Sequence, residues 1–192
     1  MKQHKRLPLA LFLVFALCIQ TLSFTSTAAA LADPEPVFSA SDMTFSSGTD
    51  AVALPQSAVT QLSGLSSGTI IVDFTPTAMS TANCLFSLSN SSVTDAYFNL
   101  YIDNRGFLGL EVRNHGETRY VNLQGPAEVT RNTRHIMALS ADPQEGYKFY
   151  FDGDMVFQMP VALYELWEYD YRFMSTVNSA DVGYMGATYR NG

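Results

Sequence analysis

Cysteine is scarce in this 192-residue chain, and so are charged side chains. The two cysteines are Cys18 and Cys84, and charged residues make up 15% of the sequence against 47% for hydrophobic ones. Cys18 lies in an apolar N-terminal run, and removal of that run leaves Cys84 without a partner for an internal disulfide. The folded part must therefore be stabilised by its hydrophobic core. A chain of roughly 150 residues is long enough for one, since it buries ~70% of its unfolded surface.

Residues 1–32 predict a secretory signal peptide. Three basic residues precede a 13-residue apolar run at positions 7–19, and Ala30-Leu31-Ala32 has the small-x-small pattern of a cleavage site. The run is too short to span a bilayer. We therefore expect a secreted protein whose folded domain is residues 33–192. Acylation of Cys18 in a lipoprotein signal is the alternative, and the leucine before that cysteine disfavours it, because a small residue is required there.

Basic residues are also few beyond the leader. The chain has a net charge of −7, and loss of the leader's three basic residues leaves −10. Nucleic acid and anionic membrane surfaces both require basic patches, so we expect neither nucleic-acid binding nor membrane insertion. An anionic small ligand is still compatible, because one or two arginines bind a carboxylate through the fork of the guanidinium group.

The clearest pattern in the chain is a β-hairpin over residues 96–114. Apolar and other residues alternate on both sides of the turn Asp103-Asn104-Arg105-Gly106, which is typical of strands with one buried face. The residues expected to face the core are Phe98, Leu100, Ile102, Leu108, Leu110 and Val112. Tyr101, Glu111 and Arg113 then share the opposite face, because residues paired across antiparallel strands lie on the same side. The sequence thus predicts an exposed patch that combines an aromatic ring, a carboxylate and a guanidinium group.

Short strand patterns separated by turn signals continue along the rest of the chain. Strands are expected at residues 37–41, within 43–53, and at 69–75, 83–89, 117–123, 134–141, 147–151, 155–159 and 182–189. Residues 56–65 have helical spacing for at most two turns, and the aromatic-rich residues 163–177 predict a packed loop. This pattern predicts an all-β, antiparallel sandwich with one short helix rather than a βαβ fold.

Five segments, in this order, resemble a known family. They are GTIIVDF at 68–74, CLFSLSNS at 84–91, YFNLYIDNRGFLGLEVRN at 97–114, GYKFYFDG at 146–153 and YMGATYRNG at 184–192. Together they resemble the lectin-like domain at the N-terminus of many bacterial sialidases, a sialic-acid-binding carbohydrate-binding module of family 40. The resemblance implies a concanavalin-A-like jelly-roll sandwich across essentially all of residues 37–192.

The resemblance also implies a ligand site. The family's Glu-x-Arg matches Glu111 and Arg113, its closing arginine matches Arg190, and a tyrosine on the preceding strand matches Tyr101. In the family the arginines hold the carboxylate of the sugar, and the glutamate accepts hydrogen bonds from its amide side. Ala82 aligns where the family often has a larger aliphatic residue beside the acetyl group. A further family tyrosine falls beyond Gly192.

The function expected is non-catalytic binding of terminal sialic acid on glycoconjugates, by a stand-alone or detached sialidase lectin module. Sialylated glycans are the expected partners, together with a sialidase catalytic domain that is C-terminal to or separate from this chain. The catalytic motifs Arg-Ile-Pro and Ser-x-Asp-x-Gly-x-Thr-Trp do not occur. A protein-binding adhesion or scaffold domain is the alternative, with Glu111 and Arg113 forming a surface ion pair. A glycosidase that uses Glu168 and Asp170 is a weaker alternative. Its two carboxylates would have to flank the scissile bond, but they lie in a segment that is predicted to be a loop.

Other candidate groups favour structural roles. Trp167 has four aromatic neighbours within a few residues, which favours a packed loop over a sugar-stacking platform. His115 and His135 lack partners at metal-ligand spacing, so no metal or cofactor is expected. Asp142, Asp152 and Asp154 lie at predicted turns, where calcium is possible but unsupported. Cys84 alternates with apolar residues, which favours a buried side chain.

Overall fold

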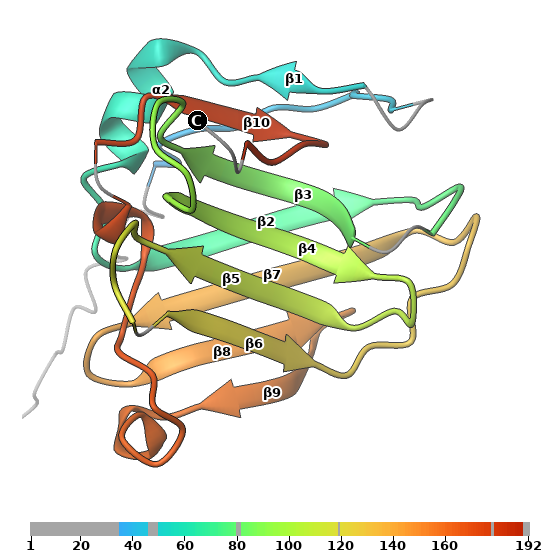
Figure 1. Ribbon diagram of the computed structural model, residues 1–192. Coiled ribbons are helices and arrows are strands. Elements are labelled where there is room, and N and C mark those ends of the chain that lie inside the picture. Colours follow the sequence, from blue (N-terminus) through green and yellow to red (C-terminus); the bar gives the residue numbers. More distant parts are fainter. Residues whose placement is uncertain (1–34, 46–49, 80–81, 119, 178, 190–192) are drawn as a thin grey trace, which may run out of the picture. The chain divides into compact units, whose positions relative to one another are not determined.

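Two antiparallel β-sheets, stacked face to face, form the unit Pro36–Gly192 (Figure 1). The computed structural model describes residues 35–45, 50–79, 82–118, 120–177 and 179–189, and the structural statements that follow concern these residues. Sheet A has six strands in the order β1-β10-β3-β4-β5-β6, namely β1 Val52–Ala53, β10 Val182–Met185, β3 Ala82–Ser89, β4 Tyr97–Asp103, β5 Leu108–Arg113 and β6 Val121–Gly125. Sheet B has four in the order β2-β7-β8-β9, namely β2 Gly68–Phe74, β7 His135–Asp142, β8 Gly146–Phe151 and β9 Asp154–Met159. The predicted all-β sandwich is confirmed.

The hydrophobic core lies between the two sheets. The hydrophobic side chains with 0% exposure are Leu88, Phe98, Leu100, Leu108, Leu110, Val112 and Val121 in sheet A, and Met137, Leu139, Tyr147 and Phe149 in sheet B. Burial of each such side chain contributes about 1.5–3 kcal/mol, the main favourable term available to a domain without a disulfide. The core positions predicted for the hairpin are all among the buried residues.

The β4–β5 hairpin follows the predicted pattern. Phe98 pairs with Val112 and Leu100 with Leu110, so the alternation of the sequence sets the register. At the turn, the amide of Gly106 donates to the carbonyl of Asp103 at 3.0 Å. Gly106 has a φ of 85°, in the left-handed region that favours glycine. Local sequence is therefore sufficient to define this hairpin.

The short helix α2, Gln56–Leu62, is confirmed at the predicted length of at most two turns. It begins after Pro55 and buries Ala58, Val59 and Leu62 against the core. The aromatic segment that follows β9 contains the 3-10 turns η1, Val161–Leu163, and η2, Met174–Thr176, with no strand in the described residues between them. This segment is thus a loop, as predicted, and it buries Tyr164, Phe173 and Met174 in the core.

Three strand predictions need correction. Residues 37–41 form no strand, because this stretch pairs with no neighbouring strand in the described chain and Val37 remains 42% exposed. Strand β6 begins at Val121 rather than at position 117, since Glu117 belongs to a turn in which its amide donates to the carbonyl of Asn114. Strand β10 ends at Met185, four residues before the predicted end.

A β-bulge changes the orientation of Cys84. The pairing of β3 with β4 shifts between Cys84 and Phe86, so Cys84 lies opposite Tyr101 while Phe86 lies opposite Leu100. A bulge inserts one extra residue into a strand. The side chains before the bulge therefore point to the opposite face from the one that a regular alternation would give them. Cys84 therefore lies on the outer face of sheet A, half-buried, and its thiol donates to the carbonyl of Ala187 at 3.0 Å. The prediction that it alternates with the core residues was wrong.

Candidate functional site

A row of polar side chains crosses the outer face of sheet A. Register places one residue from each of five neighbouring strands in this row, namely Tyr184, Ser87, Asn99, Glu111 and Asn122. Residues paired directly across antiparallel strands lie on the same face, so the whole row points away from the core. The next row contains Arg113, paired with Tyr97. The predicted placement of Glu111 and Arg113 on one face is therefore confirmed.

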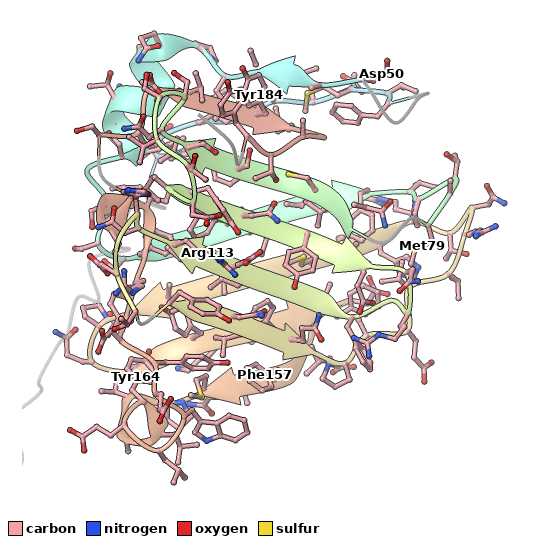
Figure 2. The ribbon with its side chains drawn as sticks, in the orientation of Figure 1. Asp50, Met79, Arg113, Phe157, Tyr164 and Tyr184 are labelled. Atoms are coloured by element: carbon pink, nitrogen blue, oxygen red, sulfur yellow. The ribbon has the colours of Figure 1, made fainter. Side chains whose placement is uncertain are left out.

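Arg113, the last residue of β5, lies on sheet A (Figure 2) and has three charged or aromatic neighbours. Its Nε donates to Oε1 of Glu111 at 2.9 Å, and its guanidinium carbon lies 4.5 Å above the ring centroid of Tyr120. Oδ2 of Asp95 is 3.8 Å from Nη1, beyond hydrogen-bond distance. Burial lowers the pKa of Arg113, but Tyr97 and Glu111 more than offset this, so the pKa lies above its ordinary value. Arg113 is thus an oriented, permanent cation whose side chain is 34% exposed.

Tyr101 lies flat on the same outer face of sheet A, two residues along β4 from Asn99, the partner of Glu111. Its ring covers Gly109, the residue paired with it, where an added Cβ would be 2.2 Å from Cζ of the tyrosine. Only glycine leaves space for the ring in this position. The Tyr101 hydroxyl accepts a hydrogen bond from Nε2 of Gln124 at 3.3 Å. The ring is therefore a rigid platform on the face that carries Glu111.

This face is less exposed than the sequence suggested. Asn99 is 1% exposed and Glu111 is 8% exposed, although both point away from the core. The segment after β10 turns over the sheet, where Oγ1 of Thr188 donates to Oδ1 of Asn99 at 2.6 Å and Oγ of Ser87 donates to the carbonyl of Ala187. The expectation of an open patch was wrong. The polar row is partly covered by a chain segment, and its groups are hydrogen-bonded to that segment.

Two predicted site residues cannot be placed completely. Arg190 lies outside the described residues, which end at Tyr189, so its assignment stays a prediction. Ala82 lies in β3, paired with Asp103, and its side chain also falls outside the described part. Of the predicted site residues, the described chain brings Glu111 and Arg113 into contact and places Tyr101 on the same face, opposite Gly109.

The groups considered for a glycosidase lie elsewhere. Glu168 has a φ of 58° in the loop that follows η1, and the carboxylate of Asp170 is 3.6 Å from Nη2 of Arg172. A second ion pair joins Arg172 to Glu117. Asp170 thus neighbours a buried cation that is already engaged by another carboxylate. Trp167 is 58% exposed on the same loop, so the prediction that it is packed was wrong.

The histidines and the other turn carboxylates have structural partners. Nδ1 of His135 is 2.8 Å from Oδ2 of Asp152, and its Nε2 accepts from the amide of Thr130. In the described part of the chain, no three His, Cys, Asp or Glu side chains form a group that could hold a metal ion. An open depression of about 410 Å³ lies beside Asp152 and Arg134, and the charged groups of both are already paired. We therefore place the candidate site on sheet A.

Sequence reasoning missed three residues around Arg113. Asn99 is recoverable from the pattern, because it alternates with Phe98 and pairs with Glu111. Asp95 and Tyr120 come from the loops before β4 and before β6, and they meet Arg113 only after the sheet has formed. No local periodicity indicates such contacts.

Comparison with known proteins identifies the family. The model of the sialidase N-terminal domain matches residues 44–192, most of the chain. The chain belongs to this family. The domain is similar to the family 40 carbohydrate-binding module of the Ruminococcus gnavus IT-sialidase, with 26% identity and a TM-score of 0.71 over 82% of this chain and 83% of that one. The predicted resemblance is confirmed.

Two further relatives extend this picture. The Ruminococcus gnavus module bound to α2,3 sialyllactose also matches, with 26% identity and a TM-score of 0.62 over 71% of this chain and 72% of that one. The anhydrosialidase of Macrobdella decora is 26% identical over 67% of this chain, which corresponds to only 17% of that protein. This domain thus spans a small part of that relative. Among the described residues, no helix is long and apolar enough to cross a membrane.

Proposed function

We propose that this domain binds terminal sialic acid on glycoconjugates and does not turn it over. In this proposal Arg113 and Arg190 hold the sugar carboxylate, and Glu111 accepts a hydrogen bond from the amide side of the sugar. Tyr101 forms the floor of the site, and Ala82 lies beside the acetyl group. The ligand class follows from the cation, because a planar guanidinium pairs with a carboxylate through two parallel hydrogen bonds, which a neutral hexose cannot form.

The orientation of Arg113 is the observation that carries the proposal. Glu111 engages Nε, and the ring of Tyr120 covers one face of the guanidinium group. Glu111 thus holds the guanidinium group at Nε, whereas the carboxylate of Asp95, 3.8 Å from Nη1, is too distant for a hydrogen bond. A cation held in one orientation loses little freedom when it binds an anion, which favours affinity. The related Ruminococcus gnavus module bound to sialyllactose supports the same ligand class.

The absence of turnover is supported by the roles of the nearby carboxylates. Hydrolysis of a glycoside commonly needs two carboxyl groups that flank the scissile bond, one of them a proton donor. Glu111 and Asp95 both face Arg113 as ion-pair partners. The sequence also lacks the Arg-Ile-Pro and Asp-containing motifs of sialidase catalytic domains. We therefore assign a lectin role, in a module that acts alone or beside a catalytic domain.

Secretion is a separate part of the proposal. The apolar run and small-x-small motif of residues 1–32 support cleavage before Asp33. N-terminal sequencing of the protein released into the medium should begin at Asp33. Retention of Met1 in the exported protein, or acylation at Cys18, would contradict the signal-peptide assignment.

The decisive experiment combines binding and hydrolysis on the mature chain. Calorimetric titration with sialyllactose should give a saturable signal, whereas lactose, which lacks the carboxylate, should give none. Prolonged incubation with sialyllactose should release no free sialic acid. Equal binding of both sugars, or of neither, would favour the scaffold alternative, in which Glu111 and Arg113 form only an ion pair. Release of sialic acid would make the protein an enzyme.

A further inference from the structure

Tyr120 lies against the guanidinium group of Arg113, whose Nη atoms would bind a ligand carboxylate. Its ring centroid is 4.5 Å from the guanidinium carbon, and the residue is 36% exposed. A ring in this position gains a cation–π interaction and keeps part of its surface open to solvent. Glu111 engages the opposite part of the cation, at Nε. Tyr120 is therefore the exposed aromatic group that directly borders the proposed anion site within the described chain.

The position of Tyr120 is fixed by the loop that leads into β6. Nδ2 of Asn114 donates to Oε1 of Glu117 at 2.7 Å, and the other oxygen of Glu117 forms an ion pair with Arg172. The side chain of Arg172 is only 6% exposed, so the loop is tied to a buried group. The residue that follows Tyr120 in the sequence, Val121, is the first residue of β6 and is 0% exposed. The ring is thus held before any ligand arrives.

Arg172 is itself tied to the core. Its amide donates to the hydroxyl of Tyr147 at 2.7 Å, and the same hydroxyl donates to its carbonyl at 2.6 Å. Tyr147 is 0% exposed and its ring stacks on Tyr171. The chain of contacts therefore runs from the sandwich core through Arg172 and Glu117 to the loop of Tyr120. A platform anchored in this way loses little conformational freedom on binding.

The chemistry of a sialoside indicates what this platform would contact. The carboxylate and the glycosidic oxygen are both attached to the anomeric carbon of sialic acid. A group beside the cation that holds the carboxylate is consequently within reach of the next sugar. Aromatic rings with exposed surface bind apolar C–H faces, and tyrosine adds a polar tip.

We propose that Tyr120 forms a second subsite, which contacts the sugar joined to the terminal sialic acid. This proposal rests on the proposed function, since it requires the carboxylate to bind at Arg113. The domain then recognises a sialylated oligosaccharide rather than sialic acid alone. Tyr120 contributes to the preference for the longer ligand, and Arg113 contributes to the binding of both.

The test compares two ligands on matched variants. The α-methyl glycoside of sialic acid reaches only the first site, whereas sialyllactose reaches both. In Tyr120→Ala, the ratio of the affinity for sialyllactose to that for the methyl glycoside should fall on the order of three- to tenfold, the range for a lost aromatic contact. Tyr120→Phe should keep the ratio of the unmodified protein, because it keeps the ring. Trp167→Ala removes an exposed aromatic residue from the separate loop and should also leave the ratio unchanged.

The other outcomes overturn the proposal. An unchanged ratio in Tyr120→Ala, with both affinities reduced equally, would make Tyr120 only a support for Arg113. A fall of the ratio in Trp167→Ala alone would place the subsite on the loop after η1. Thermal melting identifies a variant that fails to fold, in which case Tyr120→Thr, which keeps a residue suited to the start of a strand, replaces it. Failure of the unmodified protein to bind either ligand would remove the proposed function, a result distinct from failure of the subsite.

Discussion

The outer faces of the two sheets each carry an arginine–carboxylate pair. The two pairs differ in the hydrogen bonds that join the guanidinium group to the carboxylate. On sheet B, Nε of Arg134 donates to Oδ1 of Asp73 at 2.9 Å and Nη2 donates to Oδ2 at 2.5 Å. On sheet A, the hydrogen bond between Arg113 and Glu111 in the described chain runs from Nε to Oε1 at 2.9 Å. The sheet B side chains are 70% and 47% exposed, whereas those on sheet A are 34% and 10% exposed.

The difference separates a structural surface pair from a group that is available to a ligand. The hydrogen bond from Arg134 lowers the pKa of Asp73, and Asp73 raises the pKa of Arg134, so each charge is satisfied by the other. Such a solvent-exposed ion pair contributes little to the free energy of unfolding. Its charges are neutralised by each other, so it is a poor binding site for an anionic ligand. Among the described residues, Arg113 is held by one hydrogen bond from Nε, and its carboxylate partner is largely removed from water. We therefore expect equal chemical changes on the two faces to have unequal effects.

The largest difference is expected in ligand binding between Arg113→Ala and Arg134→Ala. Loss of Arg113 should weaken sialyllactose binding by about 1.5–3 kcal/mol, the range for hydrogen bonds that involve a charged group. Arg113→Lys should recover only part of this, because an ammonium group lacks the fork. Calorimetric titration of the three variants measures the effect, with Arg134→Ala expected to bind as the unmodified protein does. Similar losses in Arg113→Ala and Arg134→Ala would indicate a non-specific charge effect and remove the distinction between the faces.

The second prediction compares the stability effects of Asp103 and Asp73. Oδ1 of Asp103 accepts from the amides of Arg105 at 2.8 Å and Phe107 at 3.0 Å, and Oδ2 accepts from the Arg105 side chain. Asp103→Ala should lower the free energy of unfolding by roughly 2 kcal/mol, since it leaves the turn amides without their acceptor. Asp73→Ala should leave unfolding unchanged within error. Urea denaturation of both variants provides the measurement.

The Asp103 effect should also depend on pH. Burial acts to raise the pKa of Asp103, but its hydrogen bonds to Phe107 and Arg105 outweigh this and hold the pKa below its ordinary value. A depressed folded-state pKa gives stability that is present above the unfolded value and is lost as the pH falls through the folded value. The gap between the unmodified protein and Asp103→Ala should therefore be constant near neutral pH and should shrink below about pH 4. A gap that widens in acid would contradict this assignment.

A smaller effect is expected from Glu111→Gln. Because Glu111 is 8% exposed beside Arg113, loss of its charge should cost about 1 kcal/mol in stability and lower Tm by about 2–4 °C. Sialoside affinity should also fall, since the amide NH₂ group cannot accept a hydrogen bond. Asp73→Asn is the matched control on sheet B, and its melting curve should coincide with that of the unmodified protein. A glycan array on Glu111→Gln that matches the unmodified protein would exclude Glu111 from the site.

The smallest effect is expected from Asp95→Asn, and it has the opposite sign. Asp95 lies 3.8 Å from Nη1 of Arg113 and is half-exposed, so its charge competes weakly with a ligand carboxylate. Its removal should raise sialyllactose affinity by less than about 1 kcal/mol. Asparagine tolerates the φ of 58° that Asp95 adopts, so the loop should keep its conformation. Weaker binding by this variant would show that Asp95 supports the site instead of opposing the ligand.

Local pattern was sufficient for much of the sandwich. The alternation in β4 and β5 and the glycine at the turn determined the hairpin and placed Glu111 with Arg113. Prediction was wrong where strands depend on partners, as in the unpaired residues 37–41. It was also wrong at Cys84, because a bulge changes the facing of a residue without changing the composition of its strand.

The sequence by itself determined the β4–β5 hairpin, its core positions and the shared face of Glu111 and Arg113, because these follow from the period of two within a single hairpin. The tertiary structure decided how that face is enclosed. The contact between Thr188 and Asn99 joins residues 89 positions apart, and that between Cys84 and Ala187 joins residues 103 apart. Tyr120 likewise reaches Arg113 only through a loop anchored to Arg172. Such contacts depend on how separate strands meet in space, and no repeat along the chain specifies that meeting.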